Sequence, residues 1–121
     1  MLDLEMSCVD GCAMIAAAGS LRELDDSDTL AAALAFVPVD DHVVIDLRGL
    51  EMLSPTCARA LCGSLRERVA WAEAVVVTDR PDVTMQLVLG DVDRVVPLVA
   101  SVPQAMRVIT VRAGFDAAEV A

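Results

Sequence analysis

The stretch VVIDLRGLEMLSPTCARA, residues 43–60, holds the signals that decide the fold. It opens with a continuous apolar run, β-branched at its first three residues, which stops at Asp46. Such a run is typical of a strand that is buried on both faces of a parallel sheet. A short connection containing Gly49 follows, and Ser54-Pro55 then begins a helix, because Ser is a favoured N-cap and Pro a favoured first helical residue. In open α/β sheets, sites lie where strand ends meet helix starts, so we expect any site of this protein here.

The patterns on either side of this unit predict the other elements. Alternation, apolar runs and turn residues predict five strands, over residues 2–8, 12–18, 42–47, 74–78 and 94–99. Caps and prolines predict four helices, which start near residues 25–28, 55, 79–82 and 101. Asp10-Gly11 predicts a hairpin between the first two strands, Gly19 ends the second, and Pro97 indicates an edge strand.

The order of these elements is β-β-α-β-α-β-α-β-α, which predicts right-handed crossovers and a parallel central sheet. We therefore expect one α/β domain over residues 1–112, with a mixed, mostly parallel sheet of four to five strands and about four helices. Residues 113–121 are expected to form a short tail. The second helix is expected over 55–72, with an apolar stripe toward the sheet and four charged residues in water: Arg59, Arg66, Glu67 and Arg68.

The composition excludes several classes of partner. The net charge is −10, the pI is near 4.2 and aromatic residues make up 2% of the chain, so a nucleic-acid-binding surface is not expected. Mean hydropathy is +0.59, yet no uncharged window of 18 residues could span a membrane. There is no recognisable signal peptide. These observations favour a protein of the cytoplasm that binds neither nucleic acid nor membrane.

Signals for catalysis, metal or cofactor binding are weak. His42 is the one histidine, and the four cysteines have C-x3-C and C-x4-C spacings, which match neither a zinc motif nor a redox pair. A buried, packing role is the simpler interpretation of these cysteines. The acidic run at 25–28 could hold a metal, but acids at this position more often cap a helix. Phosphate-loop and hydrolase motifs are missing, so neither an enzyme nor a cofactor is expected, and Asp46 is expected to accept hydrogen bonds from loop N–H groups.

Thr56 is the remaining chemical feature, because its hydroxyl lies in the first turn of a helix that follows a buried strand. A helix N-terminus favours an anion, and a phosphate there would add about −1.5 to −2 charges and three acceptor oxygens. The residues therefore permit a phosphorylation switch. They also permit a simpler interpretation, in which Ser54 and Thr56 only cap the helix.

Three segments, at 43–61, 75–78 and 91–106, resemble the STAS domain of anti-sigma factor antagonists. The family's hallmark is an apolar strand that ends in an Asp-Leu segment, followed by D-S-[ST]-G at a helix start. Here the strand reads VVIDL, and the hallmark positions hold Ser54-Pro55-Thr56-Cys57. The resemblance covers most of the chain and implies a STAS-like fold.

The resemblance also implies a function. In that family the third hallmark residue is phosphorylated by a kinase that doubles as an anti-sigma factor, and the dephosphorylated domain binds this kinase and frees the sigma factor. The resemblance places the phospho-acceptor on Thr56. It places the binding surface on the loop at 49–56 and the helix at 56–70, with these candidate contact residues: Arg22, Ser54, Pro55, Thr56, Cys57 and Arg59.

This chain departs from the hallmark at several positions. Ser54 stands in place of an acid, Pro55 in place of a small residue and Cys57 in place of glycine. Arg22 stands where the G-E-L-D segment of the family ends in an acid, here as Gly19-Ser20-Leu21-Arg22. The loss of two acids changes the local charge from negative to neutral or positive. Regulation by phosphorylation can therefore be lost while partner binding through the same helix remains.

Two hypotheses follow from these residues. The first is a bacterial anti-sigma factor antagonist whose partner is an anti-sigma factor with a histidine-kinase-like ATPase fold, and which is switched at Thr56. The second is a divergent STAS module, without phosphorylation, that binds a small ligand or serves as a scaffold subunit. Either a monomer or a weak homodimer is compatible with the predicted edge strand.

Overall fold

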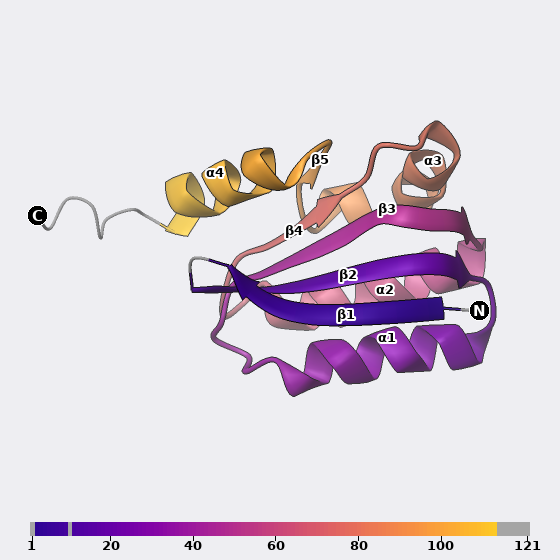
Figure 1. Ribbon diagram of the computed structural model, residues 1–121, viewed down its shortest axis with the longest axis horizontal. Helices are drawn as coiled ribbons and strands as arrows, with labels where there is room; N and C mark the ends of the chain where they lie inside the picture. The colour runs from indigo at the N-terminus through magenta and orange to yellow at the C-terminus, as the bar shows by residue number, and fades with distance from the viewer. Residues whose placement is uncertain (1, 10, 114–121) are drawn as a thin grey trace, which may run out of the picture.

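The computed structural model describes residues 2–9 and 11–113. Figure 1 shows a mixed sheet with helices packed against it. The elements run along the chain in this order: β1 Leu2–Val9, β2 Cys12–Leu21, α1 Leu24–Phe36, β3 Val43–Leu53, α2 Pro55–Arg68, β4 Ala74–Val77, α3 Pro81–Leu89, the 3-10 helix η1 Val92–Arg94, β5 Leu98–Val99 and α4 Val102–Ala113. The predicted tail lies outside the described residues except for Ala113, which ends α4.

The five strands lie side by side in the order β1-β2-β3-β4-β5. β1 pairs with β2 in an antiparallel hairpin, and every other neighbouring pair is parallel. The predicted α/β class, the mostly parallel sheet and the hairpin are confirmed. Asp10 of the predicted turn lies outside the described residues, and Gly11 has a φ of +79°, which suits a tight turn.

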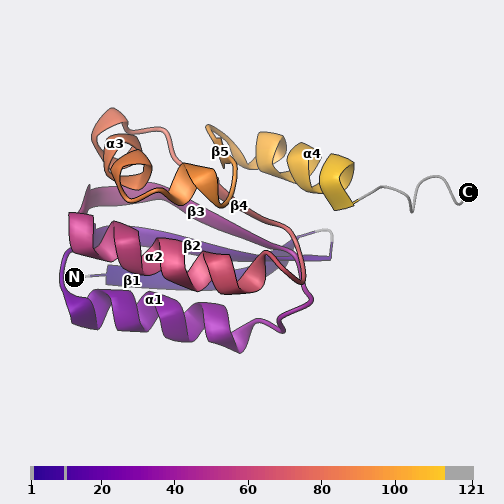
Figure 2. The same cartoon turned by 180° about the vertical axis from the view of Figure 1, so that it is seen from behind.

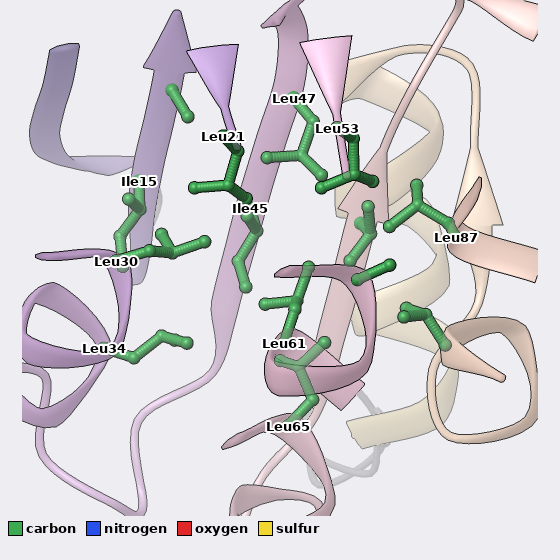
Figure 3. Packing of buried hydrophobic residues seen from close by; sticks show 14 of the residues in the cluster. Ile15, Leu21, Leu30, Leu34, Ile45, Leu47, Leu53, Leu61, Leu65 and Leu87 are labelled. Atoms are coloured by element: carbon green, nitrogen blue, oxygen red, sulfur yellow. The ribbon is translucent and has the colours of Figure 1, made fainter. Parts of the chain in front are cut away.

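Helices cover both faces of the sheet. α1 and α2 lie side by side over one face, with α3 beside them (Figure 2). Side chains from these three helices and from the sheet form the larger core, which includes Ile45, Leu61 and Leu65 (Figure 3). α4 crosses the opposite face, where Ile109 packs near Val44. The apolar run that opens β3 is therefore buried on both sides, as its sequence predicts.

Two predicted strand ends are wrong. β3 does not end at Leu47 but continues to Leu53, so Gly49 lies inside the strand and not in a connection. β2 continues past Gly19 to Leu21, with register shifts that keep it paired to β3. A Cβ on Gly49 would lie 3.0 Å from the carbonyl oxygen of Ala17, so this glycine permits close contact between strands. The predicted binding loop at 49–56 is therefore not a loop. Its residues 49–53 belong to β3 and residues 55–56 to α2, so Ser54 alone connects strand and helix.

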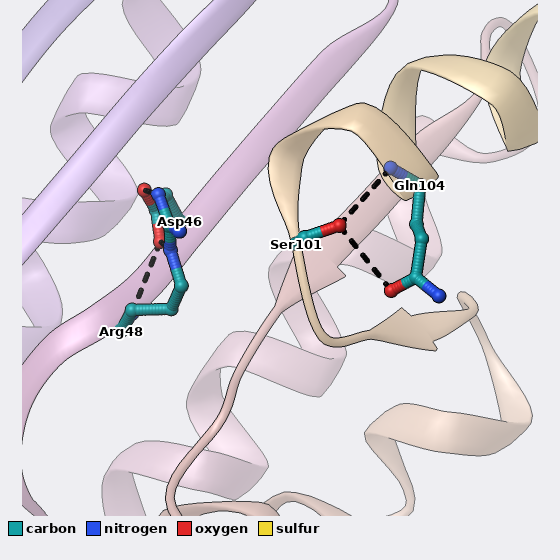
Figure 4. Close-up of polar contacts among 4 residues, drawn as sticks. All are labelled: Asp46, Arg48, Ser101 and Gln104. Atoms are coloured by element: carbon teal, nitrogen blue, oxygen red, sulfur yellow. Dashed lines mark hydrogen bonds and ion pairs between the residues drawn. The ribbon is translucent and has the colours of Figure 1, made fainter.

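In the carboxyl-terminal part of the chain, the order of the elements is as predicted, but the last strand is shorter. Residues 94–96 are not a strand, because η1 and a turn occupy this segment, and β5 has two residues at the edge of the sheet, just after Pro97. The edge position that Pro97 predicts is confirmed. The predicted cap of α4 also forms, since the hydroxyl of Ser101 accepts from the N–H of Gln104 at 3.3 Å (Figure 4).

Arg68 was predicted to face water, and that prediction is wrong. α2 ends at Arg68 instead of continuing to residue 72, and the side chain turns back toward the end of α1, where it is 7% exposed. One guanidinium nitrogen, Nη1, donates to the carbonyls of Leu34 at 3.1 Å and Val37 at 3.0 Å. The other, Nη2, donates to the carbonyls of Pro38 at 2.7 Å and Asp41 at 3.3 Å. Arg68 therefore fastens the connection between α1 and β3.

We expect Arg68→Met to lower the free energy of unfolding by about 3 kcal/mol, because four carbonyls, two of them in buried hydrogen bonds, would each lose a donor. Arg68→Lys should recover only part of this loss, since an ammonium group lacks the planar fork that reaches four carbonyls. Urea unfolding followed by circular dichroism measures both. The control is Arg66→Met, an exposed arginine two residues earlier, which should change the unfolding free energy by less than about 0.5 kcal/mol. An equal decrease in unfolding free energy in Arg68→Met and in the control would contradict this role of Arg68.

Candidate functional site

The junction between β3 and α2 is built around Ser54, the N-cap residue of α2. Its hydroxyl oxygen accepts a hydrogen bond from the backbone N–H of Cys57 at 3.2 Å. Its own N–H donates to the carbonyl of Leu21 at 2.9 Å, which holds the end of β2 beside the start of α2. Pro55 follows at the first helical position, where the missing N–H costs nothing. The predicted helix start is confirmed.

Thr56 occupies the second position of α2, and its side chain is exposed to solvent. The first N–H groups of a helix have no intrahelical acceptor and carry partial positive charge. The first turn of α2 contains no acidic residue that would compete with an incoming anion. A phosphate ester on the Thr56 hydroxyl would therefore lie at an end of the helix that favours negative charge.

The segment that leaves β2 lies against this first turn. Cys57 is fully buried, in keeping with the packing role predicted for it, and its thiol donates to the carbonyl of Glu23 at 3.4 Å. The N–H groups of Glu23 and Arg22 donate to the carboxylate of Asp26 at 3.1 and 3.0 Å. The bond from Glu23 has the larger effect, and together the two bonds hold the pKa of Asp26 below its usual 3.8. The backbone of Arg22 is thus fixed at the same edge of the sheet as Thr56.

The end of α3 packs against the other side of the first turn. A Cβ on Gly90 would lie 2.9 Å from the Cβ of Ala58 and 3.3 Å from the backbone nitrogen of Arg59. Glycine is therefore required here by the close approach of two chain segments, since its φ of −88° is open to any residue. This contact fixes the backbone at Arg59, whose side chain is exposed.

Large apolar side chains are exposed on the elements around Thr56. Five of them, on α1, β3 and α3, are at least 41% exposed: Leu24, Met52, Met85, Val88 and Leu89. α3 contacts both α2 and β3, and Figure 2 shows it near the start of α2. Exposed apolar groups with charged groups around them, here Arg22, Glu23, Glu51 and Arg59, are typical of protein-binding surfaces. We call these residues, with Thr56, the Thr56 surface.

The structure brings most of the predicted site residues together. Ser54 and Cys57 support the helix start from within, whereas Pro55, Thr56 and Arg59 are exposed on it. The contribution of α3 was not predicted from the sequence. The sequence of α3 does contain a signal for it. Val83 and Leu87 supply the buried stripe of this nine-residue helix, so its other apolar residues have no place in the core.

Asp46 is not part of this surface. It lies within β3, not at the end of a strand, and its carboxylate forms a bidentate pair with the Arg48 guanidinium, at 2.9 Å to Nε and 2.8 Å to Nη2 (Figure 4). It also accepts from the backbone N–H of Arg48 at 3.1 Å, a donor that belongs to β3 and not to the predicted loop. Partial burial raises the pKa of Asp46, but the hydrogen bonds and charge of Arg48 outweigh it and hold the pKa below 3.8.

The described residues contain no group of three or more His, Cys, Asp or Glu side chains placed to hold a metal ion. Within the same part of the chain, no helix is both long and apolar enough to cross a membrane. The acidic run at the start of α1 instead contributes the Asp26 cap.

We expect Ser54→Ala to lower the free energy of unfolding by about 1 kcal/mol, because the N–H of Cys57 would lose its cap acceptor. Thr56→Ala, at an exposed neighbouring position, should change it by less than about 0.5 kcal/mol. Thermal and urea unfolding of both variants measure these effects. A loss in Thr56→Ala as large as that in Ser54→Ala would mean that Thr56 also supports the helix start.

A second prediction concerns pH. Because the folded pKa of Asp46 lies below its unfolded value, the Asp46–Arg48 pair stabilises the fold above the unfolded pKa, and this stability is lost as pH falls through the folded pKa. Urea unfolding between about pH 6 and about pH 2 should show a smaller decrease in Arg48→Met than in the unmodified protein. Identical pH profiles would show that the pair does not contribute.

Comparison with known proteins identifies the fold by structure alone. No protein-family model matches the sequence, and no curated protein matches it. An anti-sigma factor antagonist from Mycobacterium paratuberculosis superposes with a TM-score of 0.80 at 20% identity, over 90% of this chain and 94% of that one. A putative anti-sigma factor antagonist from Thermotoga maritima gives 0.75 at 14% identity, over 88% and 93%.

A third solved structure, the anti-sigma factor antagonist SpoIIAA in its unphosphorylated form, gives a TM-score of 0.65 at 15% identity. It covers 94% of this chain and 100% of SpoIIAA. All three similarities extend over nearly the whole of both chains, so they concern the complete arrangement of sheet and helices and not one shared motif. This protein therefore has the STAS fold, the fold of the anti-sigma factor antagonists.

Proposed function

We propose that this protein is an anti-sigma factor antagonist, which binds an anti-sigma factor and thereby controls transcription that depends on a sigma factor. The observation that carries the proposal is the Thr56 surface, on a fold shared with proteins of that role. The partner is an anti-sigma factor with a histidine-kinase-like ATPase fold, and the protein acts in the cytoplasm. Its role is regulatory binding, not catalysis.

The apolar side chains supply the binding energy in this proposal. Met85 and Leu89 on α3 are 62% and 66% exposed, and Leu24 on α1 is 63% exposed, so a partner would remove much apolar area from water. Such burial is worth roughly 25 cal/mol per Å² of apolar surface before the costs of association. Arg22 and Arg59, with the exposed Glu23 and Glu51, supply charges of both signs at the same surface, which suits a polar rim around the apolar contact.

Thr56 is the switch in this proposal. A phosphate on its hydroxyl would add about −1.5 to −2 charges at a helix N-terminus that tolerates them. The modified protein would therefore stay folded. The bound partner would instead have to bury a charged, hydrated group among apolar side chains, which weakens the complex.

The first experiment tests binding. Leu89→Glu and Met85→Glu should weaken binding to the purified anti-sigma factor by at least about tenfold in calorimetry, because each places a charge within the apolar contact. The control is Phe36→Glu, which alters an 81% exposed aromatic residue at the opposite end of the helical layer and should leave the affinity within about twofold. Equal affinities in all variants, or binding to no kinase-like partner, would overturn the proposed function.

The second experiment tests the switch. Incubation with ATP and the partner kinase should add one phosphoryl group by intact mass, in the unmodified protein and in Thr29→Ala, a variant of another exposed threonine. Thr56→Ala should gain none, and Thr56→Glu should weaken the complex, since a negative charge stands where the phosphate would. No added mass in the unmodified protein, or an equal gain in Thr56→Ala, would remove Thr56 as the acceptor without affecting the binding role.

A further inference from the structure

A cleft of about 310 Å³ lies between α4 and the edge of the sheet where β2 and β3 begin. This volume is at the lower end of the range for small-molecule sites. Its apolar wall includes Cys12, Met106 and Ile109, and none of the described residues that line it is acidic. Figure 1 shows the starts of β2 and β3 at the end of the sheet near α4, away from the start of α2. The cleft is therefore separate from the Thr56 surface.

Arg107 distinguishes this cleft from an ordinary apolar groove. All nine basic residues of the chain are arginines, and within the described residues six of their side chains contact a partner: Arg48, Arg66, Arg68, Arg80, Arg94 and Arg112. Of the other three, Arg22 lies close enough to the Asp26 carboxylate to help lower its pKa, Arg59 belongs to the Thr56 surface, and Arg107 lines the cleft. In a protein with a net charge of −10, a guanidinium kept clear of the described carboxylates is an available site for an anion.

His42 also lines this cleft. Its Nδ1 accepts a hydrogen bond from the backbone N–H of Glu73 at 2.9 Å, so the neutral imidazole carries its proton on Nε2. The carboxylate of Glu73 is itself paired with Arg112 at 3.6 Å. Because His42 and Arg107 line one cleft, the Nε2–H of His42 is available as a second donor beside the guanidinium.

We propose that this cleft binds a small monocarboxylate with a short hydrocarbon chain. The planar Arg107 guanidinium matches the two oxygens of a carboxylate, and the Nε2–H of His42 can donate to the same group. The hydrocarbon chain lies against Met106 and Ile109, where it leaves water. This binding site is independent of partner binding at Thr56, because it lies at the opposite edge of the sheet.

The test is an NMR titration of the ¹⁵N-labelled protein with octanoate. We expect saturable shifts confined to residues at the cleft, and affinity at least about tenfold weaker for octanol, which has the chain without the charge. Arg107→Gln should weaken octanoate binding by about tenfold, and because Arg107 is exposed this variant should fold normally. His42→Asn, whose amide oxygen can still accept from Glu73, should weaken binding less.

The matched control is Arg94→Gln, which removes an arginine of η1 that is 79% exposed and should leave octanoate affinity within about twofold. Three results would overturn the proposal: no saturable shift with octanoate, shifts centred away from the cleft, or equal affinity in Arg107→Gln and the unmodified protein. A loss in Arg107→Gln matched by the same loss in Arg94→Gln would also overturn it, because the effect would then come from net charge alone.

Discussion

The parallel pairing of β2 and β3 is the constraint on which the rest of the structure depends. β3 is buried on both faces along its first part, so helices must cover the sheet on two sides. The pairing continues beyond the apolar run, with irregular register, until Leu21 lies opposite Leu53. The hydrogen bond from Ser54 to Leu21 then sets where α2 begins. Glycine at position 49 permits this extended pairing, because a larger residue would meet the backbone of β2.

Close packing around the first turn of α2 leaves Thr56 as the exposed part of a rigid support. Cys57 is held by the segment after β2, and Ala58 is held by the end of α3 at Gly90. A hydroxyl on such a support has a defined position without any cost of ordering a loop on binding. The positive end of the helix dipole adds a preference for negative charge there. Ser54 and Pro55, neither of which carries a charge, form the start of this helix.

The two ends of the parallel strands differ in chemistry. At the carboxyl ends of β2 and β3, exposed apolar side chains and two arginines surround Thr56. At the amino ends of the same strands, α4 leaves a cleft that Arg107 and His42 line. Arginines lie at both places, Arg22 and Arg59 near Thr56 and Arg107 at the cleft, whereas Arg68 is used within the fold to fasten the connection from α1. The number of arginines in the sequence cannot separate these roles, because each depends on which backbone carbonyls or carboxylates lie nearby.

The sequence by itself determined the order of strands and helices, the hairpin, the start of α2 and the position of Thr56 in its first turn. These features depend on local rules, since β-branched runs, caps and prolines act within a few residues. Only the tertiary structure decided how far β2 and β3 extend, that Arg68 is buried and that α3 joins the Thr56 surface. Strand length is set by the neighbouring strand, and burial of a side chain by elements distant in sequence, so neither is encoded in a local pattern.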